Sequence, residues 1–403
     1  MAPLMTRHDP DAWRSRFPIL EKKTYLVTHS LGAMPEAVYG KLKAYADHWA
    51  TSGVRAWGEG WWSSPIDVGN VLAPLLNAPE GSVVMHQNVS LIQSIVASGL
   101  DFSGKRNKIV YTDQNFPTVM YVWEGMRKFG TRIDCVPSDD GIGAPTERVL
   151  EAIDEETLLV PISHVCFKSS YLQDAEAICA RAKEVGAMVL LDTYQSLGTV
   201  PVDVQALDVD MVCGGSVKWL CGGPGAGYLY TRPDLMETFA PRITGWAAHA
   251  EPFAFELGAQ RYGEGAWRML HGSPAVPALL AATAGYEVVR ECGVETIRKY
   301  SIELNERLRA NMLDRGFQSP SPEDPHRRGG TLTIGLNEDE NGPAFVSALA
   351  DRDILVDHRP GAGIRVSPHF YTRESELERF AEIMSELRES KAWSEYATGI
   401  GAY

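Results

Sequence analysis

Short, almost continuously apolar segments alternate with amphipathic segments between about residues 80 and 231. The apolar segments are rich in Val, Ile and Leu, and we predict a β-strand in each: residues 83–86, 108–112, 132–138, 158–165, 187–193, 210–216 and 226–231. The amphipathic segments have apolar residues at helical spacing, which predicts helices over residues 90–100, 119–130, 147–154 and 174–186. Apolar strands separated by such helices are typical of a mostly parallel, seven-stranded sheet that is covered on both faces.

The pattern changes after about residue 250. Longer amphipathic segments predict helices over residues 274–292, 296–316 and 374–391. Short apolar segments between them predict strands over residues 331–336, 354–359 and 363–368. We therefore predict an α/β chain divided into an N-terminal segment that packs with the smaller domain (1–45), a large domain (46–272), a smaller α+β C-terminal domain (273–393) and a mobile tail (394–403).

Composition excludes several classes of protein. The 403 residues are 44% hydrophobic, which is typical of a globular chain. A net charge of −14 argues against a general affinity for nucleic acid or for anionic membranes. We find neither a signal-peptide pattern nor a run of 18 apolar residues, and we expect a cytoplasmic protein. The six cysteines are scattered without a CxxC pair, so we predict no metal site.

Polar or aromatic side chains follow the carboxyl ends of several predicted strands, where open α/β sheets bind their ligands. These residues are Ser90, Phe116, His164, Asp192, Gln195, Ser216 and Lys218. Asp192 ends an apolar strand, and burial there favours a cationic partner. Lys218 lies in a glycine-rich turn after the next strand, where a low dielectric favours a neutral amine. A carboxylate and a lysine so placed are what pyridoxal phosphate requires, because one keeps the pyridine nitrogen protonated and the other binds the aldehyde.

A phosphate site is expected beside this pair. Asn88, Val89 and Ser90 open a predicted helix directly after a strand, and the free N–H groups of a helix start bind anions. Ser216 adds a hydroxyl group, and Phe116 is placed to lie against the cofactor ring. We leave His164 open between a neighbour of the ring or substrate and a buried core histidine.

Residues 190–230 (LLDTYQSLGTVPVDVQALDVDMVCGGSVKWLCGGPGAGYLY) resemble the cofactor-binding core of fold-type I pyridoxal-phosphate enzymes of the class V aminotransferase group. Four other motifs resemble those of its kynureninase-like branch: HSLG (29–32), NFPT (115–118), ITGW (243–246) and the arginine motif GIRVSPHFYT (363–372). HGSPAVPA (271–278) resembles the turn that completes the phosphate site of a partner subunit. The resemblance implies the fold-type I transferase fold and a homodimer with shared active sites.

The resemblance also implies a role for individual residues. Lys218 would form the Schiff base and move the α-proton, Asp192 would pair with the pyridine nitrogen, and Gln195 would lie near the phenolic oxygen. The phosphate would be held by Val89, Ser90 and Ser216, and by Ser273 of a neighbouring subunit. The substrate would meet Arg365, which forks onto its α-carboxylate, and also Ser30 and Trp57. For Trp57, a place in the core or in a dimer interface is the alternative.

The chain departs from both of the best-known relatives of this type. Val217 and Val119 stand where kynureninases have Tyr and Asp, and Gln195 stands where they have His. Cysteine desulfurases need a cysteine ahead of the arginine motif, but residues 293–403 contain none.

We therefore expect Cα deprotonation of an L-amino acid or amino-acid conjugate, followed by cleavage at Cβ, with a C–S β-lyase favoured. A kynureninase-type hydrolase comes second, and an aminotransferase or decarboxylating deaminase also remains open. The non-enzyme alternatives are a pyridoxal-dependent sensor and a cofactor-free structural relative. The combined presence of Lys218, Asp192 and Arg365 argues against both of them.

Overall fold

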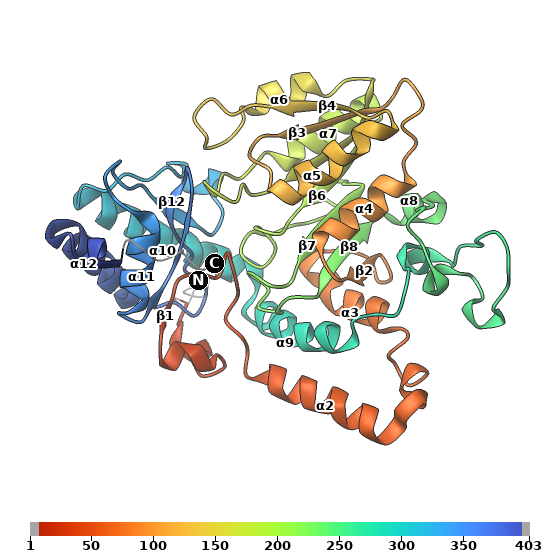
Figure 1. Ribbon diagram of the computed structural model, residues 1–403, viewed down its shortest axis with the longest axis horizontal. Coiled ribbons are helices and arrows are strands. Elements are labelled where there is room, and N and C mark those ends of the chain that lie inside the picture. Colours follow the sequence, from red (N-terminus) through yellow and green to blue (C-terminus); the bar gives the residue numbers. More distant parts are fainter. Residues whose placement is uncertain (1–7, 397–403) are drawn as a thin grey trace, which may run out of the picture.

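The computed structural model describes residues 8–396, and its central element is a seven-stranded sheet (Figure 1). The spatial order of the strands is β2-β8-β7-β6-β5-β3-β4. Their bounds are β2 (Val83–His86), β3 (Lys108–Thr112), β4 (Arg132–Val136), β5 (Thr157–Ser163), β6 (Met188–Asp192), β7 (Met211–Gly215) and β8 (Gly227–Thr231). Only β8 runs antiparallel to its neighbours, which confirms the predicted mostly parallel sheet.

Helices follow the strands and cover both faces of the sheet (Figure 1). Those of the large unit are α2 (Ala37–Ser52), α3 (Ser64–Leu72), α4 (Val89–Gly99), α5 (Pro117–Gly125), α6 (Thr146–Ala152), α7 (Ala175–Val185), α8 (Pro233–Thr238) and α9 (Val276–Cys292). Local sequence sets their ends: the side chain of Asp174 accepts a hydrogen bond from the amide of Ala177 at the start of α7, and Gly186 closes that helix in the left-handed region (φ 71°).

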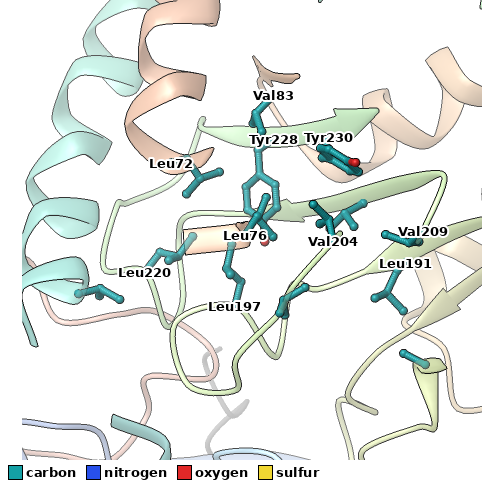
Figure 2. Packing of buried hydrophobic residues seen from close by; sticks show 14 of the residues in the cluster. Leu72, Leu76, Val83, Leu191, Leu197, Val204, Val209, Leu220, Tyr228 and Tyr230 are labelled. Atoms are coloured by element: carbon teal, nitrogen blue, oxygen red, sulfur yellow. The ribbon is translucent and has the colours of Figure 1, made fainter. Parts of the chain in front are cut away.

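The core lies on both faces of the sheet because successive side chains of a strand point to opposite sides. In β6, Val189 and Leu191 belong to one buried cluster, whereas Leu190 belongs to another. Figure 2 shows the first cluster, in which Leu72 from the end of α3 lies with Tyr228 of β8. Burial on both faces explains why the strands are almost continuously apolar in the sequence.

The C-terminal part forms a smaller unit, drawn in blue in Figure 1. Its antiparallel sheet has the order β11-β12-β9, and a parallel pair joins β1 to β10. The elements here are α1 (Asp11–Arg14), β1 (Thr24–Tyr25), α10 (Val294–Asp314), β9 (Leu332–Ile334), α11 (Gly342–Ala350), β10 (Ile354–Leu355), β11 (Asp357–Arg359), β12 (Gly363–Val366) and α12 (Glu374–Ser390). Residues near the N-terminus therefore lie beside this unit.

Several elements differ from the sequence expectation. Helices α2, α3 and α11 were not predicted, and α2 contains no buried residue although Val38, Leu42, Tyr45 and Trp49 stand at helical spacing. The strand expected over residues 354–359 is divided into β10 and β11. Helix α9 packs against α2 and α3, and the predicted domain boundary at residue 273 stays a prediction. Of the tail, residues 397–403 lie outside the described residues. Between residues 8 and 396, no helix combines the length and apolarity that crossing a bilayer requires.

Candidate active site

A cavity of about 360 Å³ opens at the carboxyl ends of β5 and β6 and reaches the start of α4. Eight of the residues predicted from the sequence line it: Ser30, Val89, Ser90, Phe116, Asp192, Gln195, Lys218 and Arg365. Nine further residues complete the wall: His29, Asn88, Thr118, Ser163, Val165, Phe167, Tyr194, Val217 and Arg359. Most of the predicted strand-end residues thus meet at one site, as expected for a parallel sheet.

Asp192 and Lys218 lie on the wall formed by the large sheet. Asp192 ends β6, is 5% exposed, and accepts a hydrogen bond from the backbone N–H of Tyr194 at 2.9 Å. Burial raises the pKa of Asp192 to about 6, although this hydrogen bond and the nearby Lys218 act in the opposite direction. Burial, together with the charge of Arg365, lowers the pKa of Lys218 to about 7, although Asp192 opposes the shift.

Aromatic rings and a close backbone contact surround Lys218. Its Nζ lies 4.5 Å from the centroid of the Tyr194 ring and 5.6 Å from that of Phe116. The amide of Gly32 donates a hydrogen bond to the carbonyl oxygen of Val217 at 2.7 Å. A Cβ atom on Gly32 would lie 2.2 Å from the carbonyl oxygen of Lys218, so only glycine fits there. Tyr194 was not singled out from the sequence, although it stands between two predicted site residues.

The start of α4 forms the polar end of the cavity. The side chain of Asn88 accepts a hydrogen bond from the amide of Leu91 at 3.0 Å, and this caps the helix. The amides of Val89 and Ser90 belong to the first turn, which has no intrahelical carbonyl partners, and both residues line the cavity. The start of α4, a buried carboxylate and a partly buried amine therefore share one wall. This donor set fits the phosphate, ring nitrogen and aldehyde of pyridoxal phosphate.

The opposite wall comes from the C-terminal unit and carries paired charges. Arg365 forks onto Asp357, with Nε 2.8 Å from Oδ1 and Nη2 2.5 Å from Oδ2. The same carboxylate contacts His29 Nε2 at 2.9 Å and Arg359 Nη2 at 3.0 Å. Burial favours the neutral carboxyl, but His29 and Arg365 outweigh it and hold the pKa of Asp357 well below its ordinary value. Burial and Arg365 lower the pKa of His29 to about 4.

The sequence did not point to Asp357 or Arg359, and His29 entered only as part of a motif. The spacing of Asp357 and Arg359 in the sequence could have indicated that they lie together. Asp357 and Arg359 stand two positions apart in a predicted strand, which places both side chains on one face. Their partner Arg365 lies in the next predicted strand.

Two predicted cofactor residues lie outside the cavity wall. His164 follows β5, and its neighbours Ser163 and Val165 line the cavity while His164 does not, as alternation along an extended segment requires. Its backbone N–H instead donates to the carbonyl oxygen of Asp192 at 2.8 Å. The hydroxyl of Ser216 donates to the carbonyl oxygen of Ala226 at 2.6 Å and contacts the hydroxyl of Tyr286, so it is engaged in the core.

Ser273 and Trp57 also lie away from the cavity of this chain. Ser273 is exposed, and its role toward a partner subunit stays a prediction. Trp57 packs edge-on against Trp61 and Trp62, with ring centroids 5.6 Å and 6.5 Å away. For Trp57, the contacts favour the packing role that was the alternative in the sequence analysis.

The sequence of this chain is similar to those of several known proteins. The family model "Aminotransferase class-V" matches residues 25–380. The chain is 30% identical to the uncharacterized aminotransferase YcbU of Bacillus subtilis, over 92% of this chain and 96% of that protein. It is 29% identical to the kynureninase of Pseudomonas fluorescens, over 95% of this chain and 93% of that protein.

Solved structures with lower identity share the fold. A cysteine desulfurase from Thermococcus onnurineus NA1 superposes with a TM-score of 0.86 at 21% identity, covering 96% of this chain and 100% of that one. The cystine C–S lyase C-DES superposes with a TM-score of 0.83 at 21% identity, covering 92% of this chain and 99% of that one.

Proposed function

Because the chain belongs to the class V aminotransferase family of pyridoxal-phosphate enzymes, we propose that it removes the α-proton of an amino-acid substrate and then cleaves a bond at Cβ, with a carbon–sulfur bond as the favoured target. When bound, pyridoxal phosphate withdraws electrons from Cα and so acidifies the α-proton. The remaining tasks belong to the side chains of the cavity.

The two walls of the cavity would divide substrate binding, cofactor binding and proton transfer between them. Arg365 binds the substrate α-carboxylate, and Asp192 offers its carboxylate to the ring nitrogen of the cofactor. Lys218, whose pKa of about 7 leaves much of it neutral at physiological pH, accepts the α-proton on Nζ. Lys218 is partly buried, with the rings of Tyr194 and Phe116 beside its Nζ.

The apolar character of the wall beside Lys218 carries the choice of reaction. Val217 precedes the lysine directly and lines the cavity with Val165, Phe116 and Phe167. Elimination of a β-substituent needs a base and room for the leaving group, and aromatic rings pack well against sulfur. The apolar residues on this wall therefore support elimination, although polar side chains such as Ser163 and Tyr194 also line the cavity.

The positions of the cysteines also bear on sulfur chemistry. Among the residues that the structure describes, no cysteine lines the cavity. Cys135 is exposed, and the other five cysteines are buried. A persulfide carried on a protein cysteine is therefore not part of the proposal. The expected products of an S-alkyl cysteine are the free thiol, pyruvate and ammonia, with one water consumed.

Kynurenine hydrolysis is the second candidate because of the 29% identity to the Pseudomonas fluorescens kynureninase over 95% of this chain. Transamination is the third, and the match to YcbU, which is named as an aminotransferase, favours it.

A product assay separates the three reactions. The holoenzyme is incubated with S-ethyl-cysteine, kynurenine and common amino acids, and products are identified by mass spectrometry. Free thiol with pyruvate is the expected result, and anthranilate with alanine, or amino-group transfer to a keto acid, would overturn the proposed reaction. Lys218→Ala should reduce turnover strongly, whereas Lys183→Ala removes an exposed lysine paired with Asp208 and should not.

A further inference from the structure

Asp357 is the centre of the charge cluster on the C-terminal wall of the cavity. Its side chain is 1% exposed and contacts three other side chains: Arg365 of the neighbouring strand, Arg359 of its own strand, and His29 of the loop after β1. Arg365, Arg359 and His29 all line the cavity, whereas Asp357 lies behind them. The carboxylate therefore acts on the cavity only through the residues that it holds.

Strand register fixes the fork between Asp357 and Arg365. The two residues are directly opposite each other in the antiparallel pair β11–β12, so their side chains leave the same face of that sheet. The Arg365 side chain is 3% exposed, and a third contact, from Nη1 to the carbonyl oxygen of Phe167 at 2.7 Å, holds the guanidinium from another direction. Both the position and the plane of the guanidinium are thus determined before any substrate binds.

These contacts leave a defined part of Arg365 for a ligand. A guanidinium has five N–H groups, and contacts with residues 8–396 use three of them, one each on Nε, Nη1 and Nη2. One N–H on Nη1 and one on Nη2 remain, and these can donate hydrogen bonds to a substrate carboxylate. Two guanidinium groups share the single carboxylate of Asp357, so the cluster keeps one excess positive charge when His29 is neutral.

We propose that Asp357 is the positioning residue of the substrate site, which orients Arg365 for the α-carboxylate of the amino acid. This inference rests on the proposed function only in requiring an amino-acid substrate, and it is the same for elimination, hydrolysis and transamination. Binding without turnover therefore tests it separately from the reaction type.

Alanine and ethylamine form a matched pair of probes, because ethylamine is alanine without its carboxylate. The affinity of each for the holoenzyme is measured from the change in the cofactor's absorbance, in wild type and in Asp357→Asn. We expect Asp357→Asn to weaken alanine binding about 10- to 100-fold and to leave ethylamine binding within about threefold. An equal loss for both probes, or no loss for alanine, would overturn the proposal.

Two further variants separate position from charge and from general stability. Asp357→Glu keeps the negative charge but moves the carboxylate relative to Arg365, and it should bind alanine nearly as weakly as Asp357→Asn does. Full recovery of alanine binding in Asp357→Glu would show that charge alone matters and would contradict the positioning role. Asp353→Asn removes a half-exposed aspartate paired with Lys23 in the same segment, and it should bind both probes like wild type.

If Asp357→Asn does not fold, the variant Arg365→Lys replaces it in the comparison. It keeps the positive charge next to Asp357 but lacks the two remaining N–H groups of the fork. Selective loss of alanine binding supports the contact between Arg365 and the carboxylate on which the proposal depends, and unchanged alanine binding would contradict the proposal because Asp357 would then have no binding group to position.

Discussion

The two walls of the cavity treat buried charge in opposite ways. On the wall of the large sheet, Asp192 and Lys218 have pKa values of about 6 and about 7, because burial disfavours both charges and no ion pair forms between them. On the C-terminal wall, Asp357 and Arg365 are in direct contact, and that contact keeps both of them charged.

This difference supports the proposed roles, with proton transfer on one wall and substrate binding on the other. A group whose pKa lies near the working pH exchanges protons readily, as a general base must. A carboxylate whose pKa is held well below its ordinary value keeps its charge at every physiological pH, which suits a fixed binding site. Variants on the two walls should therefore fail in different ways.

The largest effect is expected from Lys218→Ala on the sheet wall. Loss of the base should reduce kcat by about 10²- to 10⁴-fold, measured with whichever substrate the product assay identifies. The purified variant should also lack the visible absorbance band that borohydride removes from wild type. A variant that keeps this band would contradict the assignment of Lys218 as the residue that binds the cofactor aldehyde.

On the C-terminal wall, Arg365→Lys should act mainly on substrate binding. The charge remains but the bidentate contact is lost, so kcat/KM should fall about 10- to 100-fold, with most of the change in KM. The pH at which kcat is half-maximal should stay close to that of wild type, because Lys218 is unchanged in this variant. A selective loss of kcat at unchanged KM would contradict the prediction that the C-terminal wall acts in substrate binding.

The sheet wall also predicts how the stability of the cofactor-free protein depends on pH. Between pH 7 and the ordinary pKa of lysine, the unfolded chain binds a proton on Lys218 that the folded protein does not. Stability contributed by this residue therefore rises with pH in that window and falls as pH drops toward 7. From pH 7 to 9, the Tm of wild type should rise by about 1–3 °C relative to Lys218→Met, as measured by calorimetry. A parallel pH dependence in both proteins would contradict the pKa shift.

The smallest effect is expected from His164→Asn. His164 lies at the end of β5 but is not part of the cavity wall, so the absorbance of the bound cofactor and KM should stay within about twofold of wild type. A large change in the absorbance band would show that His164 does contact the cofactor and would contradict this prediction.

The sequence was most informative where local pattern and chemistry coincide. Strands β2 and β3 match their predicted bounds, because fully buried strands give continuous apolar runs between helices. Asp192 and Lys218 were found because each follows such a run. The surface helix α2 was missed although Val38, Leu42, Tyr45 and Trp49 recur at helical spacing, because the prediction followed a strand–helix alternation that begins only near residue 80. His164 was left open between a neighbour of the ring and a core histidine, and Ser216 was expected at the phosphate from its strand-end position and from the resemblance; neither argument says where a side chain points.

By itself, the sequence determined the α/β architecture, the cofactor and the residues at the strand ends, because these follow from the order of elements along the chain and from residue type. Only the tertiary structure decided which charges pair. Asp357 meets His29 across 328 positions of the chain, and its fork with Arg365 depends on the register of two short strands. Burial sets the pKa values of Asp192 and Lys218. It depends on all the segments that pack around these residues and exclude water, so it is a property of the folded structure and not of the local sequence.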